Sequence, residues 1–202
     1  MSDLFGKEII NKSSYRASSK NRDSNDFYQT PSSIVKQLLE VENFNSVILE
    51  PCCGNNAIVN VLLQNGYDVI SYDLFHGENR KDFLTETEKY KTIITNPPFK
   101  MANEFIIKSF NIVTDKSAFL LPLDYLHGKY RYDKIFSIRK PSIVYVFVRR
   151  PLFENNIRND GLYKTGSTTF AWFIFDMKGN GKEDPRIKFI DNSEYVLRKK
   201  YE

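Results

Sequence analysis

One strand-like segment ends on four residues whose chemistry suits the recognition of a planar amine. The run TIIT at 92–95 is typical of a buried strand and leads directly into Asn96, Pro97, Pro98 and Phe99. Proline cannot donate to a strand ladder and holds the preceding residue extended, so the strand must stop at Asn96. The side-chain oxygen of Asn96 and the carbonyl oxygen of Pro97 then match the two N–H donors of an exocyclic amino group. Phe99 adds a flat face for stacking.

This arrangement favours attack by the amine itself on an electrophilic methyl group. Two acceptors on one NH₂ localise its lone pair and direct it outward. Because the motif contains no strong base, positioning and electrostatics would supply the rate. The alternative is a plain Pro-Pro turn, but an Asn-Pro-Pro-aromatic sequence directly after a buried strand favours the chemical interpretation.

Alternating strand and helix patterns must position these four residues. Strand patterns cover 46–50, 67–73, 92–95, 117–123, 142–148 and 169–177, and helix patterns begin near 30, 57, 105 and 130. Such alternation predicts an α/β fold with a doubly wound, mostly parallel sheet and helices on both faces. The last two strands are separated only by a polar loop, which predicts an antiparallel hairpin at one edge of the sheet. Thr30 is the expected N-cap of the first helix, with Pro31 at its first position.

The residues that follow each strand are candidates for ligand binding, because a doubly wound sheet binds at its carboxyl edge. The first strand ends at Glu50, before a loop whose only glycine, Gly54, excludes the G-x-G-x-x-G dinucleotide fingerprint. A glycine turn lets a ligand approach bare backbone, and the acidic Glu50 suits an ammonium group better than a pyrophosphate. The alternative is a turn that serves the fold alone.

Two further acidic positions suit a nucleoside. Asp73 ends the second strand and can accept both hydroxyls of a ribose. Asp82 and Phe83 precede the third strand, where a carboxylate can accept from an adenine amino group and a ring can cover its face. Taken singly, Asp73 is better explained as an exposed Asp that caps the next turn, and Asp82 and Phe83 are better explained as a solvated Asp beside a core Phe.

Composition bounds the class of protein. The 202 residues, 41% of them hydrophobic, suit one globular domain. Adjacent Cys52 and Cys53 cannot form a disulfide framework, and with only His76 and His127 as further soft ligands we expect no metal site. Without a bilayer-length apolar run or a signal peptide, a cytoplasmic protein without a membrane partner is expected. Of the net charge of +4, residues 1–22 contribute +3 and residues 198–202 contribute +2.

Taken together, these motifs resemble S-adenosylmethionine-dependent amino-methyltransferases, and the chain is most similar to phage and bacterial N6-adenine DNA methyltransferase-like proteins. The resemblance covers residues 26–177, and its most specific element is the Asn-Pro-Pro-Phe sequence at 96–99. The motif order is that of the γ class. It implies a Rossmann-like sheet of seven strands with an antiparallel final hairpin. It also implies catalysis by Asn96, Pro97, Pro98 and Phe99.

The resemblance implies S-adenosyl-L-methionine as the cofactor. The positions that it assigns to cofactor binding are Tyr28, Thr30, Glu50, Pro51, Cys52, Gly54, Asp73, Asp82, Phe83 and Asn96. The chain departs from the family at Asn56, where a second glycine is usual, and a positive φ there would weaken cofactor affinity. It also has no room for a separate target-recognition domain, so specificity must be low, come from a partner protein or reside in loops.

The expected organisation is a flexible basic arm (1–25), a methyltransferase domain (26–190) and a basic tail (191–202). The partner is nucleic acid, with DNA favoured, reached in the cytoplasm of a bacterial host if the chain is phage-encoded. A long basic loop after 142–148 is the expected contact region, because basic, aromatic and amide side chains can touch backbone or bases. Its contact residues are Arg149, Arg150, Phe153, Arg158 and Lys164.

The expected activity is methyl transfer to adenine N6 in DNA. Two alternatives stay open. The same acceptors fit cytosine N4, a base in RNA or a glutamine amide. A phage protein that kept the fold as a binder, with weak or no catalysis, is also consistent with the changed glycine loop.

Overall fold

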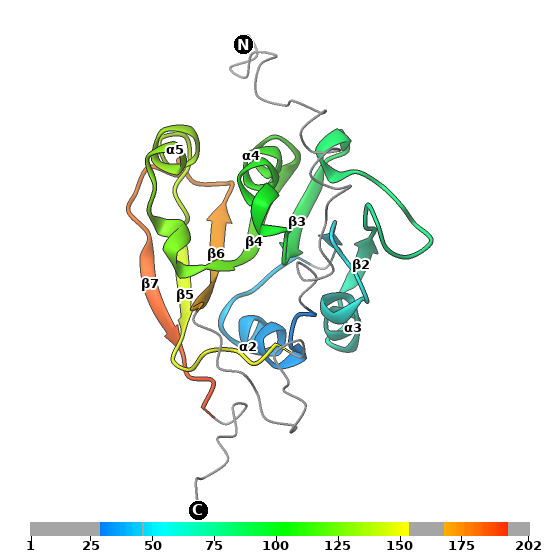
Figure 1. Cartoon of the computed structure of the whole chain (residues 1–202). Helices are drawn as coiled ribbons and strands as arrows, with labels where there is room; N and C mark the ends of the chain where they lie inside the picture. The colour runs from blue at the N-terminus through cyan, green and yellow to red at the C-terminus, as the bar shows by residue number, and fades with distance from the viewer. Residues whose placement is uncertain (1–28, 46, 154–167, 194–202) are drawn as a thin grey trace, which may run out of the picture.

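Seven strands form one mixed sheet in the computed structural model, which describes residues 29–45, 47–153 and 168–193 (Figure 1). The strands are β1 (Val47–Glu50), β2 (Asp68–Ser71), β3 (Tyr90–Thr95), β4 (Val113–Pro122), β5 (Ile143–Phe147), β6 (Phe170–Asp176) and β7 (Arg186–Ile190). Their order across the sheet is β2-β1-β3-β4-β6-β5-β7. The doubly wound, mostly parallel sheet predicted from sequence is confirmed.

The antiparallel pair is present, but it does not lie at the edge of the sheet. Strand β6 pairs antiparallel with both β4 and β5 and is inserted between them. Its residues are buried from Phe170 to Phe175, as expected of a strand with covered faces. The edge is formed by β7, which pairs parallel with β5. Four of the five β7 residues are exposed, so this strand lacks the buried run by which the other strands can be recognised.

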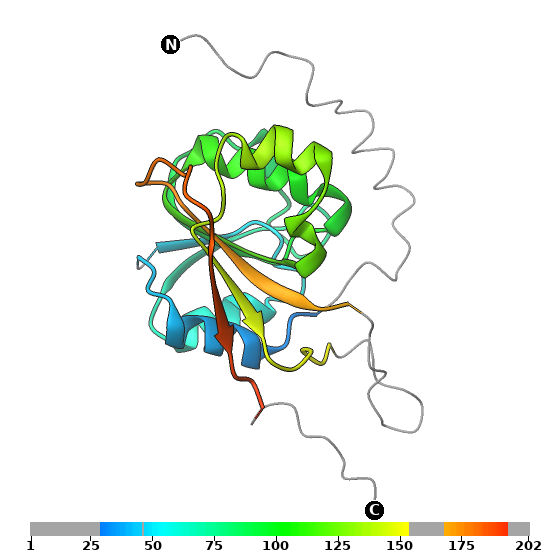
Figure 2. The same ribbon diagram turned by 90° about the vertical axis from the view of Figure 1, so that its left-hand side faces the viewer.

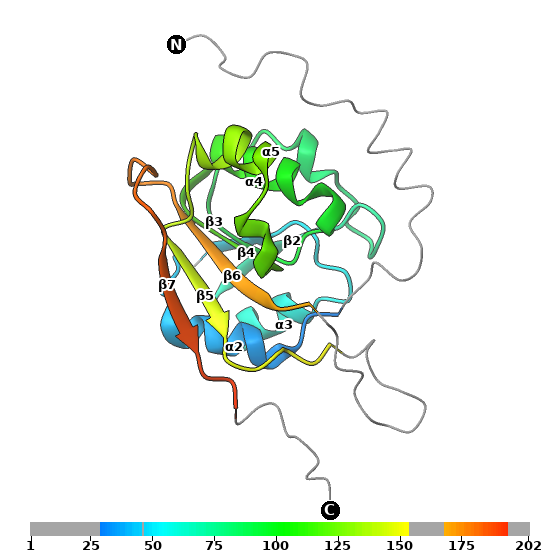
Figure 3. The same cartoon turned by 60° about the vertical axis from the view of Figure 1, so that its left-hand side comes forward.

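Helices cover both faces of the sheet (Figures 2 and 3). Helices α2 (Ser32–Val41) and α3 (Ala57–Gln64) pack on one face, and α4 (Ala102–Ile112) packs on the other with α5 (Lys129–Arg131) and its continuation η5 (Tyr132–Phe136). Strand β4 shows why two cores form: Ala118 and Leu120 belong to the α2–α3 core, whereas Phe119 and Leu121 belong to the α4–η5 core. Successive side chains of a strand point to opposite faces.

The short connections complete the scaffold. The described residues include the 3₁₀ turns η2 (Phe83–Thr85), η3 (Phe99–Met101) and η4 (Leu123–Leu126). The first helix begins at Ser32 with Pro31 at its N-cap position, so Thr30 is not the cap that the sequence predicted. Within the described ranges, no helix has the length and apolarity required to cross a membrane.

Candidate active site

A cleft lies where the chain leaves β1, β2 and β3 at the carboxyl edge of the sheet. It encloses about 570 Å³ of space when its open mouth is included. Its lining comprises Gln29, Thr30, Cys52, Cys53, Gly54, Asn55, Ala57, Ile58, Asp73, Asn96, Pro97, Pro98 and Phe99. The fold therefore brings the Asn-Pro-Pro-Phe sequence, the glycine loop and the acidic end of β2 together around one space.

Residues 96–99, called the tip below, form one wall of the cleft. The side-chain nitrogen of Asn96 donates to Thr30 Oγ1 at 3.1 Å, and Thr30 is 6% exposed. This bond uses the donor end of the amide and holds the plane in which the acceptor oxygen lies. The Phe99 ring packs against Phe170 with 5.6 Å between centroids. The tip is thus held by the segment before α2 on one side and by β6 on the other.

The glycine loop (residues 51–56) forms the facing wall with strained local backbone. Gly54 has φ +48° and Asn56 has φ +61°, both in the left-handed region. The loop is closed by Asn56 N–H, which donates to the Cys53 carbonyl at 2.7 Å. Helix α3 begins directly after Asn56. The position where the family usually carries a second glycine therefore does require positive φ, which asparagine tolerates better than most residues.

Replacement of Asn56 tests this backbone requirement. We expect Asn56→Ala to lower the free energy of unfolding by about 1 kcal/mol, because an alanine Cβ is unfavourable in the left-handed region. Asn56→Gly should leave it within about 0.5 kcal/mol of the wild type, since glycine reaches this conformation freely but gains entropy when unfolded. Urea denaturation measures both. Asn55→Ala is the control, and an equal loss there would show that the effect is not one of φ.

Asp73 joins the glycine loop to the segment after β2. Its Oδ2 accepts from Gly54 N–H at 3.1 Å, while Oδ1 accepts from Phe75 N–H at 2.7 Å and His76 N–H at 3.0 Å. The His76 ring nitrogen lies 3.2 Å from the same Oδ1. A carboxylate offers about four acceptor positions, two on each oxygen. The arrangement leaves Oδ2 able to accept from one ribose hydroxyl, where the sequence led us to expect two.

Glu50 lies behind the cleft and does not line it. The side chain is fully buried, and its Oε1 accepts from Thr95 Oγ1 at 2.6 Å and from Cys52 N–H at 2.9 Å. Its Oε2 is buried and has no hydrogen-bond partner among the described residues. Burial raises the pKa of Glu50 to about 8; the charge of Asp73 adds to this, and the two hydrogen bonds oppose it. The sequence analysis identified Glu50 as a cofactor-binding position but did not predict that its side chain is fully buried.

The cysteines of the glycine loop line the cleft as thiols. Neither forms a disulfide, and burial raises the pKa of the Cys53 thiol to about 11, with the charges of Asp73 and Glu50 adding to the shift. A thiol with this pKa stays protonated at neutral pH and is a poor nucleophile. In the described part of the chain, no group of three or more His, Cys, Asp or Glu side chains is arranged to hold a metal ion.

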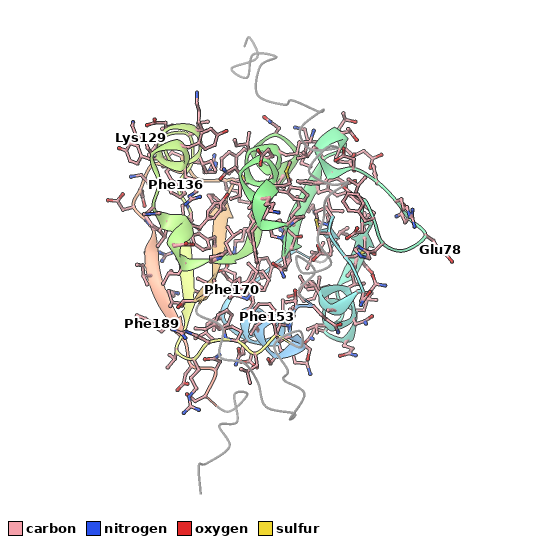
Figure 4. All side chains as sticks on the ribbon, viewed as in Figure 1. Glu78, Lys129, Phe136, Phe153, Phe170 and Phe189 are labelled. Atoms are coloured by element: carbon pink, nitrogen blue, oxygen red, sulfur yellow. The ribbon has the colours of Figure 1, made fainter. Side chains whose placement is uncertain are left out.

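Two aromatic predictions need correction. Phe83 is 1% exposed and packs on Phe105 at 4.7 Å between ring centroids, so its ring cannot cover an adenine. Its neighbour Asp82 caps η2 by accepting from Leu84 N–H at 2.9 Å, and it does not line the cleft. Phe153 is 2% exposed and packs on Phe170 with 4.8 Å between ring centroids, so it cannot reach a nucleic acid. Figure 4 labels both side chains, which lie near each other. The rings of Phe83 and Phe153 are both buried in the hydrophobic core.

The basic loop is only partly described. Arg150 is exposed and Arg149 is half-buried, and Asn192 forms two hydrogen bonds of 2.7 Å with the Arg149 backbone. Pro51, the first residue of the glycine loop, is buried and does not line the cleft. The predicted sites Tyr28, Arg158 and Lys164 lie outside the described residues, as do the arm (1–25) and most of the tail. Sequence reasoning missed Thr95 and Phe170, whose roles depend on residues distant in the chain.

Comparison by sequence finds no matching family model and no matching curated protein. Solved structures do match. A Listeria monocytogenes protein assigned as a class I S-adenosylmethionine-dependent methyltransferase has a TM-score of 0.56 at 15% identity, over 90% of this chain and 71% of that one. The modification subunit of a type I restriction enzyme from Vibrio vulnificus has a TM-score of 0.58 at 13% identity, over 94% of this chain and 51% of that one.

A third similar structure is that of a Pyrococcus horikoshii protein assigned as an RNA methyltransferase. It has a TM-score of 0.53 at 15% identity, over 74% of this chain and 85% of that one. The chain spans about half the length of the type I modification subunit. At such identities the likeness concerns the path of the backbone. The chain has the fold of class I S-adenosylmethionine-dependent methyltransferases.

Proposed function

We propose that this protein transfers a methyl group from S-adenosyl-L-methionine to an exocyclic amino group of a nucleic-acid base, with adenine N6 in DNA as the target. The observation that carries the proposal is the shared cleft: the tip, the glycine loop and Asp73 all line it. A ligand held by the loop therefore lies beside an amine held by the tip.

The cleft residues fit this cofactor. Gly54 leaves the loop backbone bare for close approach, and Asp73 Oδ2 can accept from one hydroxyl. Behind the loop, the buried Oε2 of Glu50 has no hydrogen-bond partner among the described residues, so a cation in the cleft would offset an otherwise costly buried carboxylate. When bound, S-adenosyl-L-methionine supplies an electrophilic methyl group on a positively charged sulfur.

The chain's own contribution is to hold and orient the amine. The Asn96 side-chain oxygen and the Pro97 carbonyl accept its two N–H groups, and Phe99 supports the plane of the base. The ionisable residues that line the cleft in the described part of the chain are Cys52, Cys53 and Asp73. Because the Cys53 thiol stays protonated and Asp73 is tied to backbone N–H groups, positioning carries the reaction without a strong base, and water takes the proton that the amine loses.

Three observations support a nucleic-acid substrate. Structures of the same fold include a type I modification subunit and a protein assigned as an RNA methyltransferase. Phe99 lines the cleft with an aromatic ring, on which a planar base can stack. Arg150 follows β5 and is exposed, and arginine is a common phosphate-contacting residue in nucleic-acid interfaces. Since adenine N6 is hidden in a duplex, a DNA substrate must present the base flipped out or in a single strand.

We further propose that sequence specificity comes from a partner protein. The chain spans about half of the type I modification subunit, and the described residues form one sheet domain without a second globular unit.

A methyl-transfer assay with radiolabelled S-adenosyl-L-methionine tests the proposal across duplex DNA, single-stranded DNA and RNA. Digestion to nucleosides should place the label on N6-methyladenine from DNA. Label on cytosine or in RNA would reassign the substrate, while cofactor binding with no transfer to any of the three would favour a non-catalytic binder. Absence of cofactor binding would reject the proposal.

A further inference from the structure

A buried pair of hydrogen bonds joins the two walls of the cleft through one atom. Glu50 Oε1 accepts from the Thr95 hydroxyl at 2.6 Å and from the Cys52 N–H at 2.9 Å. The Glu50 and Thr95 side chains are both fully buried. Thr95 is the last residue of β3 and immediately precedes Asn96, while Cys52 lines the opposite wall. The carboxylate of Glu50 therefore connects the glycine loop to the residue that precedes the tip.

The strength of this connection depends on what occupies the cleft. A hydrogen bond to an ionised carboxylate is roughly twice as strong as one between neutral groups. A cation beside the glycine loop favours the ionised form of Glu50, because charges interact strongly where water is excluded. Ionised Glu50 then holds the Thr95 hydroxyl more firmly, and Thr95 fixes the backbone from which Asn96 projects.

We propose that the Thr95 hydroxyl couples occupation of the cleft by the cationic cofactor to the grip of the tip on the target amine. The inference rests on the proposed function and adds a positioning residue that holds the tip through Glu50. Coupling between two ligands is reciprocal: whatever factor the cofactor adds to nucleic-acid affinity, the nucleic acid adds to cofactor affinity. Thr95 itself touches neither ligand.

Binding measurements test the coupling without turnover. The dissociation constant of a fluorescent, adenine-containing single-stranded DNA is measured with and without sinefungin, a cationic analogue of the cofactor that cannot transfer a methyl group. For the wild type we expect about fivefold tighter DNA binding with sinefungin. Thr95→Val, which keeps the side-chain shape but removes the donor, should bring this ratio near one. Thr95→Ser keeps a hydroxyl donor and should keep most of the wild-type ratio.

The same strand supplies a matched control. Thr92 is fully buried in β3, and its hydroxyl has no hydrogen-bond partner in the described part of the chain. Thr92→Val is the same change three residues earlier and should keep the wild-type ratio. If Thr92→Val also lowers the ratio, the effect is one of packing and the coupling role is rejected. A wild-type ratio of one, or a Thr95→Val ratio equal to that of the wild type, rejects it as well.

Failure of the coupling can be told apart from failure of the proposed function. Sinefungin binding to the wild type is measured separately by calorimetry. Absence of sinefungin binding overturns both the proposed function and the coupling. Sinefungin binding that leaves DNA affinity unchanged overturns the coupling alone. Should Thr95→Val fail to fold, Thr95→Ala takes its place, with Thr92→Ala as its control. A ratio near one in Thr95→Ala together with the wild-type ratio in Thr92→Ala supports the coupling, and equal ratios in the two variants reject it.

Discussion

Asn96→Ala is expected to lower the rate of methyl transfer by about 10²-fold or more, while the dissociation constant for S-adenosyl-L-methionine changes by less than about threefold. Removal of one oriented polar group from a preorganised site typically has this effect on the rate. The substitution removes one of the two acceptors for the amine and also the 3.1 Å hydrogen bond to Thr30. Single-turnover transfer of radiolabel measures the rate, and calorimetry measures cofactor binding.

A matched asparagine controls for this substitution. Asn60 is exposed on α3 and does not line the cleft, so Asn60→Ala should retain the wild-type rate. Asn96→Asp keeps an acceptor oxygen and should lose less activity than Asn96→Ala. Wild-type turnover by Asn96→Ala would mean that the tip is only a turn, and the assignment of the amine site would have to be abandoned.

Affinity for S-adenosyl-L-methionine should rise with pH, by about tenfold per unit between pH 6 and pH 8. Burial raises the pKa of Glu50 to about 8, so the carboxyl is mostly protonated below that pH when the cleft holds no cation. A bound cation favours the ionised form and lowers this pKa, so binding releases a proton. Below pH 8 that proton release costs affinity, and above pH 8 the cost disappears.

Calorimetry in two buffers of different ionisation enthalpy counts the released proton. Glu50→Gln cannot ionise, so its affinity should be nearly independent of pH and fall furthest below the wild type at pH 8. The other charged or titratable groups facing Glu50 are Asp73 and Cys53, and His76 lies 3.2 Å from Asp73. His76→Gln is the control, because it removes the ring that lies beside Asp73. Loss of the pH slope in His76→Gln would move the effect from Glu50 to His76.

The raised pKa of Glu50 also predicts how the free energy of unfolding changes with pH. Its pKa in the folded state, about 8, lies above the ordinary value of 4.5, so the folded chain binds the proton more tightly than the unfolded chain does. The contribution of Glu50 to the free energy of unfolding is therefore fully present below about pH 4.5 and is lost as the pH rises towards 8. This pH dependence should be absent in Glu50→Gln, which urea denaturation at pH 6 and pH 8 can measure.

The sequence by itself determined the tip and the class of fold. Two consecutive prolines cannot enter a strand ladder, so β3 had to end before Pro97 wherever the rest of the chain lay, and its last residue is Thr95. The alternation of apolar strands with amphipathic helices similarly predicted the doubly wound sheet, because these periods report which side of each element is buried. Such rules act between residues close in the chain, and single-sequence reasoning can therefore apply them.

Tertiary structure alone decided which side chains are available for chemistry. Glu50 looked like a direct ligand and lies behind the cleft, and Phe83 and Phe153 looked like contact residues and are buried in the core. The Thr95–Glu50 bond joins residues 45 positions apart, and the insertion of β6 between β4 and β5 follows from pairing across the whole sheet. Burial and hydrogen bonding of this kind depend on neighbours that are distant in sequence, and a local pattern carries no information about them.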